Sequence, residues 1–185
     1  MSDQQVIDEI LLGNQSLFRL LVEKYQSMVF TTAMGFVHSK EDAEDLTQDI
    51  FVKAWESLST FKGDAVFSTW LYRITINSCI NHVEKKKRNI FLELAEEWMN
   101  KLFNSESTAK DSQQQMEETE QDVAIRRAID SLPVNQRTVF VLSAYDELSQ
   151  KEIAVIMQRT EGAVEQLLQR AKTNLRKKLA HSVGN

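Results

Sequence analysis

The scarcity of residues that break helices limits the fold of this chain more than any other feature. One proline and five glycines occur among 185 residues. Hairpin turns depend on glycine, proline or asparagine at fixed positions, so this chain has few places where strands could reverse. Leucine, glutamate, lysine, glutamine and alanine, which favour helices, are plentiful. The sequence therefore predicts an all-α protein.

A polar segment divides the chain. Residues 104–122 read NSESTAKDSQQQMEETEQD, in which Ala109 and Met116 are the only apolar residues. Such a segment cannot bury enough surface to offset the entropy lost on ordering, which predicts a mobile linker. We expect two small helical domains, residues 1–91 and 123–185, joined by a linker over 92–122. A weaker amphipathic pattern predicts a helix at the start of that linker, over residues 92–103.

Apolar residues at helical spacing predict four helices in the first domain. The first ends at Gly13, and Asn14 is expected to cap a second helix that continues to residue 37. Ser39 is a capping residue for a third helix, which ends at about residue 57. The fourth is expected to begin near Ser68 or Thr69 and to continue into a run of lysines.

The second domain has the proportions of a helix-turn-helix. Helices are expected over 123–131 and 135–145, followed by a short helix capped by Ser149, with Glu152 at the capping-box position. Thr160 then caps a long helix. In a helix-turn-helix the second helix enters the major groove of DNA. The alternative is an ordinary helical hairpin with a basic tail.

Charge is segregated along the chain. The net charge of −5 argues against a protein that coats nucleic acid with its whole surface, but it allows local basic elements. The basic residues gather in two clusters, Lys85, Lys86, Lys87 and Arg88 in the first domain and Arg170, Lys172, Arg176, Lys177 and Lys178 in the second. Taken singly, each cluster could also be a solvated helix end, where cations suit the helix dipole.

Several classes of protein are not indicated. The single cysteine, Cys79, excludes an internal disulfide and fits a reducing cytoplasm; we expect a small core residue, with redox sensing as an alternative. The acidic N-terminus and the lack of a long apolar run predict a cytoplasmic protein without membrane insertion. Cys79 and His82 alone do not make a zinc site. No catalytic arrangement or cofactor site is recognisable, so we expect no enzyme and no cofactor.

Two motifs resemble one known family. The segments DAEDLTQDIFVKAW and FSTWLYRITINSCINHVEKKKR resemble the second domain of bacterial sigma factors, and IDSLPVNQRTVFVLSAYDELSQKEIAVIM with LLQRAKTNLRKKL resembles the fourth. These two domains alone, joined by a short linker, are the architecture of the extracytoplasmic-function sigma factors. The resemblance implies binding to the clamp helices and flap of core RNA polymerase and to promoter DNA. An inhibitory anti-sigma factor is implied by family habit.

The resemblance assigns polymerase binding to one acidic helix. The matching positions are Asp42, Asp45, Leu46, Gln48, Asp49, Phe51 and Val52. By spacing alone, Asp42, Asp45 and Asp49 form an acidic stripe that suits a basic partner. A solvated face with an Asp49–Lys53 pair is the alternative.

The resemblance assigns recognition of the −10 promoter element to the loop before the fourth helix and to that helix. The matching positions are Phe61, Ala65, Phe67, Ser68, Asn77, Lys85, Lys86, Lys87 and Arg88. A flipped base needs an apolar wall and amide groups, and Asn77 offers both a donor and an acceptor. The lysines would neutralise phosphates. Phe61 could either face a base or close over the previous helix, and the sequence leaves both readings open.

The resemblance assigns contacts with the −35 element to the last helix. The expected contacts are Glu165, Gln166, Gln169, Arg170, Thr173 and Arg176. Many relatives carry a small hydroxyl residue and a basic residue near positions 165–167, so this chain departs from the commoner pattern and Arg170 is the best-supported contact. Glu165 could accept from a cytosine amino group or merely repel phosphate.

Two other classes of function compete with this interpretation. A helix-turn-helix regulator could carry an all-helical sensing or dimerisation domain in place of the polymerase-binding one. An all-helical adaptor or anti-sigma-like protein would never contact DNA, which the two basic clusters disfavour. The acidic helix discriminates, because a sigma factor needs it to bind polymerase and a regulator does not.

Overall fold

The computed structural model of the chain describes residues 1–103 and 119–182, and within these residues it contains helices and no strands. The all-α prediction is confirmed. The elements in order are α1 (Asp3–Leu11), η1 (Gln15–Leu17), α2 (Phe18–Val37), α3 (Lys40–Ser57), η2 (Leu58–Thr60), α4 (Phe67–Phe103), α5 (Glu120–Asp130), α6 (Val134–Ala144), α7 (Gln150–Met157) and α8 (Glu161–Ser182). No helix in the described ranges is both long enough and apolar enough to cross a membrane.

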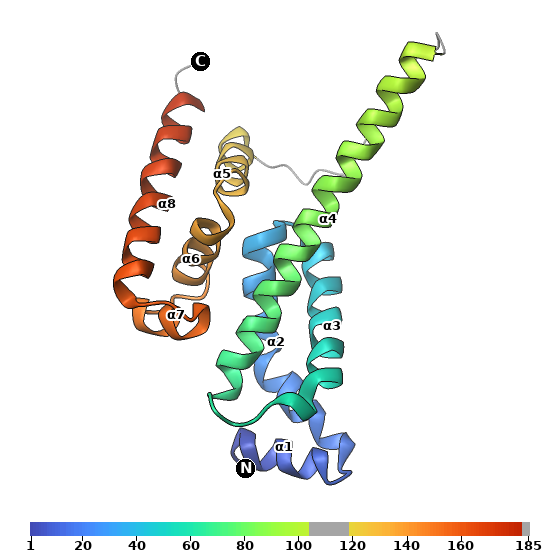
Figure 1. The fold of residues 1–185 in the computed structure, drawn as a ribbon, viewed down its shortest axis with the longest axis vertical. Helices are drawn as coiled ribbons and strands as arrows, with labels where there is room; N and C mark the ends of the chain where they lie inside the picture. The colour runs from blue at the N-terminus through green and yellow to red at the C-terminus, as the bar shows by residue number, and fades with distance from the viewer. Residues whose placement is uncertain (104–118, 183–185) are drawn as a thin grey trace.

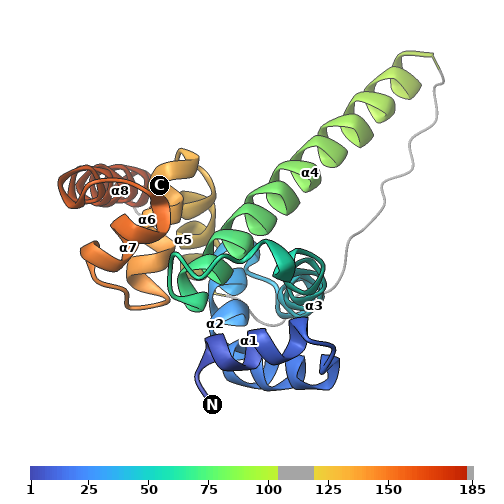
Figure 2. The same ribbon diagram turned by 60° about the horizontal axis from the view of Figure 1, so that its bottom comes forward.

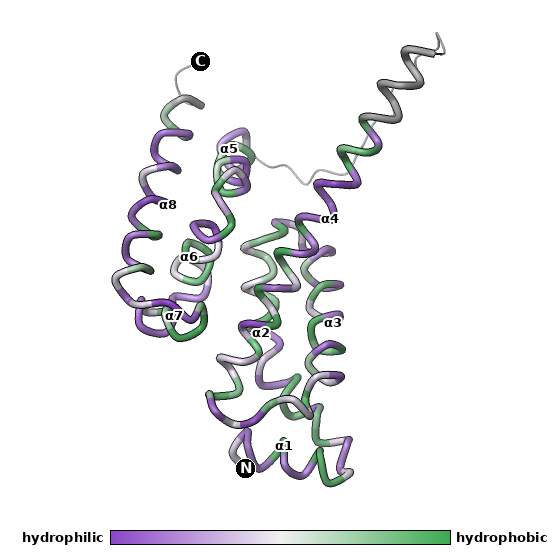
Figure 3. The backbone as a smooth tube through the Cα atoms, in the orientation of Figure 1, coloured by the Kyte–Doolittle hydropathy of each residue, from purple (hydrophilic) through white to green (hydrophobic). Residues whose placement is uncertain are grey.

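The helices α1 to α4 form the N-terminal unit. Helices α2 and α3 and the first part of α4 lie side by side, with α1 across one end, while the rest of α4 projects beyond the bundle (Figures 1 and 2). Figure 3 shows hydrophobic and hydrophilic residues interleaved along these helices, as amphipathic packing requires. Their apolar sides meet in a core that includes Leu21, Val29, Ile50 and Leu71, each at most 1% exposed.

The helices α5 to α8 form the C-terminal unit, in which α8 packs against α5, α6 and α7. Side chains from α6, α7 and α8, including Leu142, Ile153 and Val164, share one fully buried core. The predicted caps are present, because Ser149 Oγ accepts from the Glu152 amide and Thr160 Oγ1 accepts from the Ala163 amide. The α7–turn–α8 segment is therefore the helix-turn-helix that the sequence predicts.

Two predicted helix starts differ from the structure. Asn14 does not cap α2, because a 3₁₀ turn intervenes and the Asn14 amide donates to Glu9 instead. Helix α5 begins at Glu120 rather than at residue 123, because Thr119 and Asp122 form a capping box. The predicted linker over 92–122 thus starts within α4 and ends within α5. Most of the segment expected to be mobile, residues 104–118, lies outside the described residues.

The two units pack directly against each other, α6 on α2 and α7 on α4. Val141 of α6 is buried in the core of the N-terminal unit, and Tyr72 and Ile76 of α4 are buried in the core of the C-terminal unit. Gly35 makes the approach of α6 possible, because a Cβ atom at this position would lie 2.6 Å from Val141 Cγ1. The sequence pattern contains no indication of this contact.

Candidate nucleic-acid interface

An aromatic cluster supports the loop before α4. The Phe61 ring is 9% exposed and the Phe67 ring 2% exposed. The two rings meet edge to face with centroids 5.6 Å apart, and Phe61 also lies 5.5 Å from Trp70. Of the two readings left open for Phe61, this packing matches closure of the core. Both phenylalanine rings lie beneath the loop rather than project from it.

The loop itself is exposed above these rings. Gly63 has a φ of 75°, a conformation that glycine adopts readily, and it bends the chain between Phe61 and α4. Val66 is 67% exposed. Ala65 and Ser68 are half-buried beside it, at the N-terminus of α4. The loop thus presents small side chains and backbone groups to solvent.

Asn77 lies on the exposed surface of α4, two turns beyond the loop residues. It lines a hollow of about 260 Å³ together with Arg73 and Ile80 of the same helix. The opposite wall comes from the C-terminal unit and includes Asn135 and Gln158. Asn77 is therefore reachable, but the C-terminal unit crowds the space in front of it.

The basic cluster on α4 is partly engaged within the protein. Lys86 Nζ lies 2.7 Å from Asp42 Oδ2, so a predicted phosphate contact and a predicted polymerase contact pair with each other. Lys87 donates to the backbone carbonyl of Asp130. Lys85 and Arg88 are exposed.

One face of α3 is buried and the other is open. Leu46 and Phe51, both expected to bind polymerase, are 3% and 7% exposed and pack into the core. Val52 is 56% exposed. The exposed side of α3 carries Val52 together with Asp45, Gln48 and Asp49. These four residues and Trp55 are called the α3 surface below.

Trp55 is a residue that the sequence analysis missed. Its side chain is 36% exposed, and its ring lies 5.0 Å from the Phe18 ring of α2. Both rings line a shallow hollow at the edge of the α3 surface. Its position three residues after Val52 could have identified it, because residues three apart share a helix face.

The predicted −35 contacts all lie on one helix and face solvent. Val164, Leu168 and Ala171 turn inward from α8 and are buried. The expected contacts are all exposed on the same helix: Glu165, Gln166, Gln169, Arg170, Thr173 and Arg176. Helix α8 lies on the side of the C-terminal unit away from the N-terminal unit (Figures 1 and 2). This row of polar side chains is free to enter a groove.

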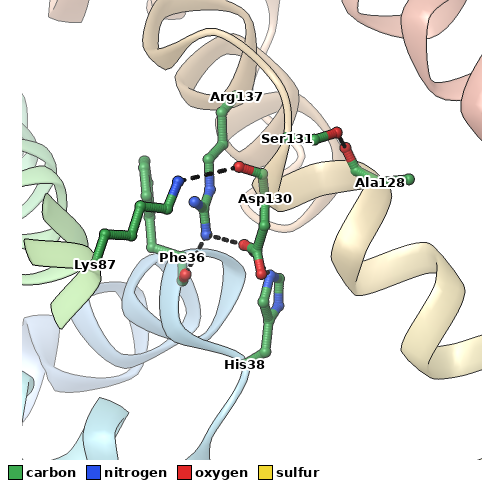
Figure 4. Close-up of polar contacts among 7 residues, drawn as sticks. All are labelled: Phe36, His38, Lys87, Ala128, Asp130, Ser131 and Arg137. Carbon is green, nitrogen blue, oxygen red and sulfur yellow. Dashed lines mark hydrogen bonds and ion pairs between the residues drawn. The ribbon is translucent and has the colours of Figure 1, made fainter. Parts of the chain in front are cut away.

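A polar cluster between the two units was not predicted (Figure 4). Arg137 of α6 is 4% exposed, forms an ion pair with Asp130 at 2.6 Å and donates to the carbonyl of Phe36 in α2. His38 Nε2 lies 3.2 Å from the same carboxylate. Burial raises the pKa of Asp130, but the hydrogen bond with His38 and the charge of Arg137 outweigh burial and leave this pKa below its ordinary value.

Asp146 forms a second polar contact between the units. Thr32 Oγ1 of α2 lies 2.9 Å from its carboxylate and 3.0 Å from the Met28 carbonyl, and the Tyr72 hydroxyl of α4 also bonds to Asp146. Burial raises the pKa of Asp146 to about 6, against the opposing effect of these hydrogen bonds. A protonated Asp146 can donate to Thr32, which leaves the single Thr32 proton for Met28.

The Asp146 contact predicts a pH dependence of stability. The pKa of Asp146 is about 6 in the folded protein and 3.8 in the unfolded chain, so the folded state binds the proton more tightly. The resulting stabilisation is complete below pH 3.8 and is lost as the pH rises through about 6. Lowering the pH from about 7.5 to about 5 should therefore stabilise the protein relative to an Asp146→Asn variant. Urea unfolding midpoints of both proteins at both pH values measure this. Identical pH profiles would show that Asp146 does not titrate in this window.

Cys79 has the character of a core residue. Its side chain is fully buried, and burial raises the pKa of its thiol to about 12, which disfavours the reactive thiolate. Within residues 1–103 and 119–182 no group of three or more metal-ligating side chains is assembled.

Two family models match the chain, one in each unit. Residues 21–89 match Sigma-70 region 2, and residues 122–175 match Sigma-70, region 4. The first range contains α3, the loop and the basic cluster of α4. The second contains the helix-turn-helix and most of α8.

Curated relatives match over nearly the whole chain. The RNA polymerase sigma-H factor of Pseudomonas aeruginosa is 34% identical over 185 residues, covering 96% of this chain and 93% of that protein. The ECF RNA polymerase sigma-E factor of Escherichia coli K12 is 33% identical over 175 residues, covering 93% of this chain and 91% of that protein.

Solved structures share the fold. CnrH, solved in complex with the cytosolic domain of CnrY, superposes with a TM-score of 0.65 at 27% identity and covers 97% of both chains. The sigma factor RpoE from Bartonella quintana, solved with the anti-sigma factor NepR, superposes with a TM-score of 0.58 at 23% identity, covering 88% of this chain and 96% of that one.

Proposed function

The chain belongs to the extracytoplasmic-function sigma factors, which bind core RNA polymerase and direct promoter-specific initiation, and from this premise we propose which surface performs each step. The observation that carries the assignment is the presence of both sigma regions, in the family's order, in a chain that matches its relatives over almost its full length. The alternative, a regulator with a sensing or dimerisation domain, does not account for the region 2 match. The chemistry of RNA synthesis belongs to the polymerase, and the sigma factor is not an enzyme.

The α3 surface is the proposed contact with the clamp helices of polymerase. Its acidic side chains, Asp45 and Asp49, suit a basic partner, and steer it electrostatically. Val52 and Trp55 add an exposed apolar centre of the kind that dominates binding energy at protein interfaces. Leu46 and Phe51 support the surface from the core, and the C-terminal unit would bind the flap.

The loop before α4 and the exposed face of that helix form the proposed −10 surface. Its members are Ala65, Ser68, Asn77, Lys85, Lys86, Lys87 and Arg88. Asn77 would bond to the edge of a base flipped from the duplex, and the loop would cover the base with small side chains and backbone groups. Phe61 and Phe67 hold the loop in place from below. The cations would bind phosphates once Lys86 and Lys87 leave their internal partners.

Helix α8 is the proposed recognition helix for the −35 element. Arg170 is the strongest candidate for a bidentate contact with guanine, and Gln166 and Gln169 can bond to adenine. Glu165 would accept from a cytosine amino group. Thr173 and Arg176 lie further along the helix and would contact the DNA backbone.

Three further properties are proposed. The functional domains are residues 1–91 and 123–185 with a linker over 92–122, consistent with the extents of the two family matches. The protein acts in the cytoplasm, where RNA polymerase lies. An anti-sigma factor controls it, a proposal supported by CnrH and the Bartonella RpoE, each of which was solved with a bound partner.

The decisive test is reconstitution of the purified protein with core RNA polymerase and fragmented genomic DNA. We expect a stable complex and initiation from a small set of discrete promoters, read by sequencing the 5′ ends of the transcripts. Core polymerase alone is the control. If the protein neither joins the core enzyme nor directs initiation from any discrete site, the proposed function is wrong.

A further inference from the structure

The loop before α4, residues 62–66, is held by its surroundings rather than by its own backbone, and it is called the −10 loop below. Within the described part of the chain, residues 62–65 make no backbone–backbone hydrogen bond. Val66 accepts such bonds from the Thr69 and Trp70 amides, where α4 begins. The position of the −10 loop therefore depends on the side chains that pack against it.

Tyr25 of α2 extends the aromatic cluster beneath the −10 loop. Phe61 and Phe67 stand at the two ends of the loop and contact each other. The Tyr25 ring is 9% exposed, and its centroid lies 5.4 Å from that of Phe67. A displacement of Tyr25 would therefore be transmitted to the end of the loop that leads into α4.

The hydroxyl of Tyr25 is bound to the first turn of α1. It donates to Asp3 Oδ2 at 2.5 Å, and Lys24 Nζ lies 2.6 Å from Asp3 Oδ1. Burial raises the pKa of Asp3, but the hydrogen bonds from Lys24 and Tyr25 outweigh burial and leave this pKa below its ordinary value. Asp3 is thus charged at neutral pH, and hydrogen bonds to a charged group are the stronger kind.

Gln4, the next residue of α1, reaches the −10 loop directly. A Cβ atom built on Gly63 would lie 3.1 Å from Gln4 Oε1, which is closer than ordinary van der Waals contact. Gln4 Nε2 donates to Asp8 Oδ1 at 2.9 Å, which fixes the amide with its oxygen toward the loop. Helix α1 lies across the end of the bundle at which the chain passes into α4 (Figures 1 and 2).

These contacts match what a base pocket requires. A binding site must hold its groups within a fraction of an ångström of the productive geometry. The −10 loop lacks internal hydrogen bonds over most of its length, so α1 and the aromatic cluster supply its preorganisation. The apolar side of α1 is buried in the same core as Phe61 and Phe67, which gives the helix a fixed place from which to act.

We propose that α1 is a positioning element of the −10 surface, in which Gln4 and the Asp3–Tyr25 hydrogen bond hold the −10 loop in the conformation that receives a flipped base. The proposal rests on the proposed function of that loop. Gln4, Asp3 and Tyr25 are positioning residues, since they act on DNA only through the loop. The competing explanation is that α1 merely completes the core and contributes to stability.

The experiment uses two variants of the full-length chain, each with a matched control. Gln4→Ala removes the side chain that meets the loop, and Gln26→Ala makes the same change at an exposed position of α2. Tyr25→Phe removes the hydroxyl but keeps the ring on Phe67, and Tyr145→Phe makes that change at a residue 38% exposed in the other unit. Urea unfolding midpoints establish that each variant is folded.

Each protein is combined with core polymerase on a promoter identified by the reconstitution. Affinity for the closed duplex is measured in the cold, and permanganate reactivity then gives the rate of opening. We expect Gln4→Ala and Tyr25→Phe to slow opening by about 10-fold, because a misplacement of about 1 Å can cost up to about 100-fold in a reaction step. Affinities for polymerase and for the closed duplex should stay within about twofold of the parent, as should every property of both controls.

A double-mutant cycle shows whether Gln4 acts through the −10 loop. Combined with Ser68→Ala, on the −10 surface, Gln4→Ala should slow opening by less than about threefold, because the contact that it positions is already lost. Combined with Arg170→Ala, on the −35 helix, the two effects should multiply to within about twofold. A contribution to stability alone would give the same result in both combinations.

Unchanged opening rates in Gln4→Ala and Tyr25→Phe would overturn the proposal while leaving the sigma function intact. So would parallel losses of polymerase binding and opening, because these indicate a general structural role for α1. Failure of the parent itself to bind polymerase would instead reject the proposed function, and the positioning role with it.

Discussion

Replacing Val52 with glutamate is expected to abolish association with core RNA polymerase while the protein stays folded. Val52 is 56% exposed at the centre of the α3 surface, so the substitution does not disturb the core. In the complex the new carboxylate would be buried against the clamp helices beside Asp45 and Asp49, where desolvation is not compensated. We expect affinity to fall by about 100-fold or more, which corresponds to roughly 2.7 kcal/mol. Titration of labelled polymerase with each protein measures the loss.

Leu12→Glu is the matched control for this substitution. Leu12 is 83% exposed at the end of α1, which packs on α2 rather than on α3. The control introduces the same charge into the same unit and should bind polymerase like the parent. Normal binding by Val52→Glu would place the polymerase contact elsewhere, and equal losses in both variants would indicate a general effect of added negative charge.

Asn77→Ala is expected to slow promoter opening by about 10- to 100-fold, because a bidentate contact with a base is worth about 1–3 kcal/mol. Asn77 is exposed on α4 and Ile76 and Ser78 beside it carry the packing, so the fold should be unaffected. Polymerase binding should also be unchanged, since the α3 surface is intact. Permanganate reactivity of unpaired thymines on a promoter identified by the reconstitution measures the rate of opening.

Asn89→Ala provides the comparison on the same helix. Asn89 is exposed beyond Arg88, and it is not part of the proposed −10 surface. Its substitution should leave promoter opening within about twofold of the parent, well below the change expected when a base contact is lost. Parallel losses of opening and of polymerase binding in Asn77→Ala would mean that Asn77 has a structural role.

Local features of the fold could be predicted from the sequence because they depend on residues a few positions apart. Ser39 caps α3 and Ser149 caps α7, as expected, since a side-chain oxygen meets an amide three residues ahead. Asn14 failed as a cap because the neighbouring Glu9 captured its side chain and a 3₁₀ turn intervened. The exposed row on α8 was also predictable, because residues 165, 166, 169, 170 and 173 follow the helical repeat.

Side chains that serve two competing roles could not be resolved in this way. Phe61 could close the core or face a base, and its packing against Phe67 and Trp70 matches the first of these readings. Lys86 was expected to contact DNA and Asp42 to contact polymerase. In the structure the two side chains form an ion pair with each other, although they are 44 positions apart in the sequence. Neither outcome is encoded in local spacing.

By itself the sequence determined the helical fold and the two sigma regions, and it indicated the helix for each proposed contact, because helical periodicity and short motifs express these properties locally. Only the tertiary structure decided that the units close on each other. That contact depends on the missing side chain at Gly35, on Arg73, Lys87 and Arg137 reaching helix ends distant in sequence, and on the partial burial of Asp146. These are properties of three-dimensional proximity and desolvation, which a linear pattern of residue types does not contain.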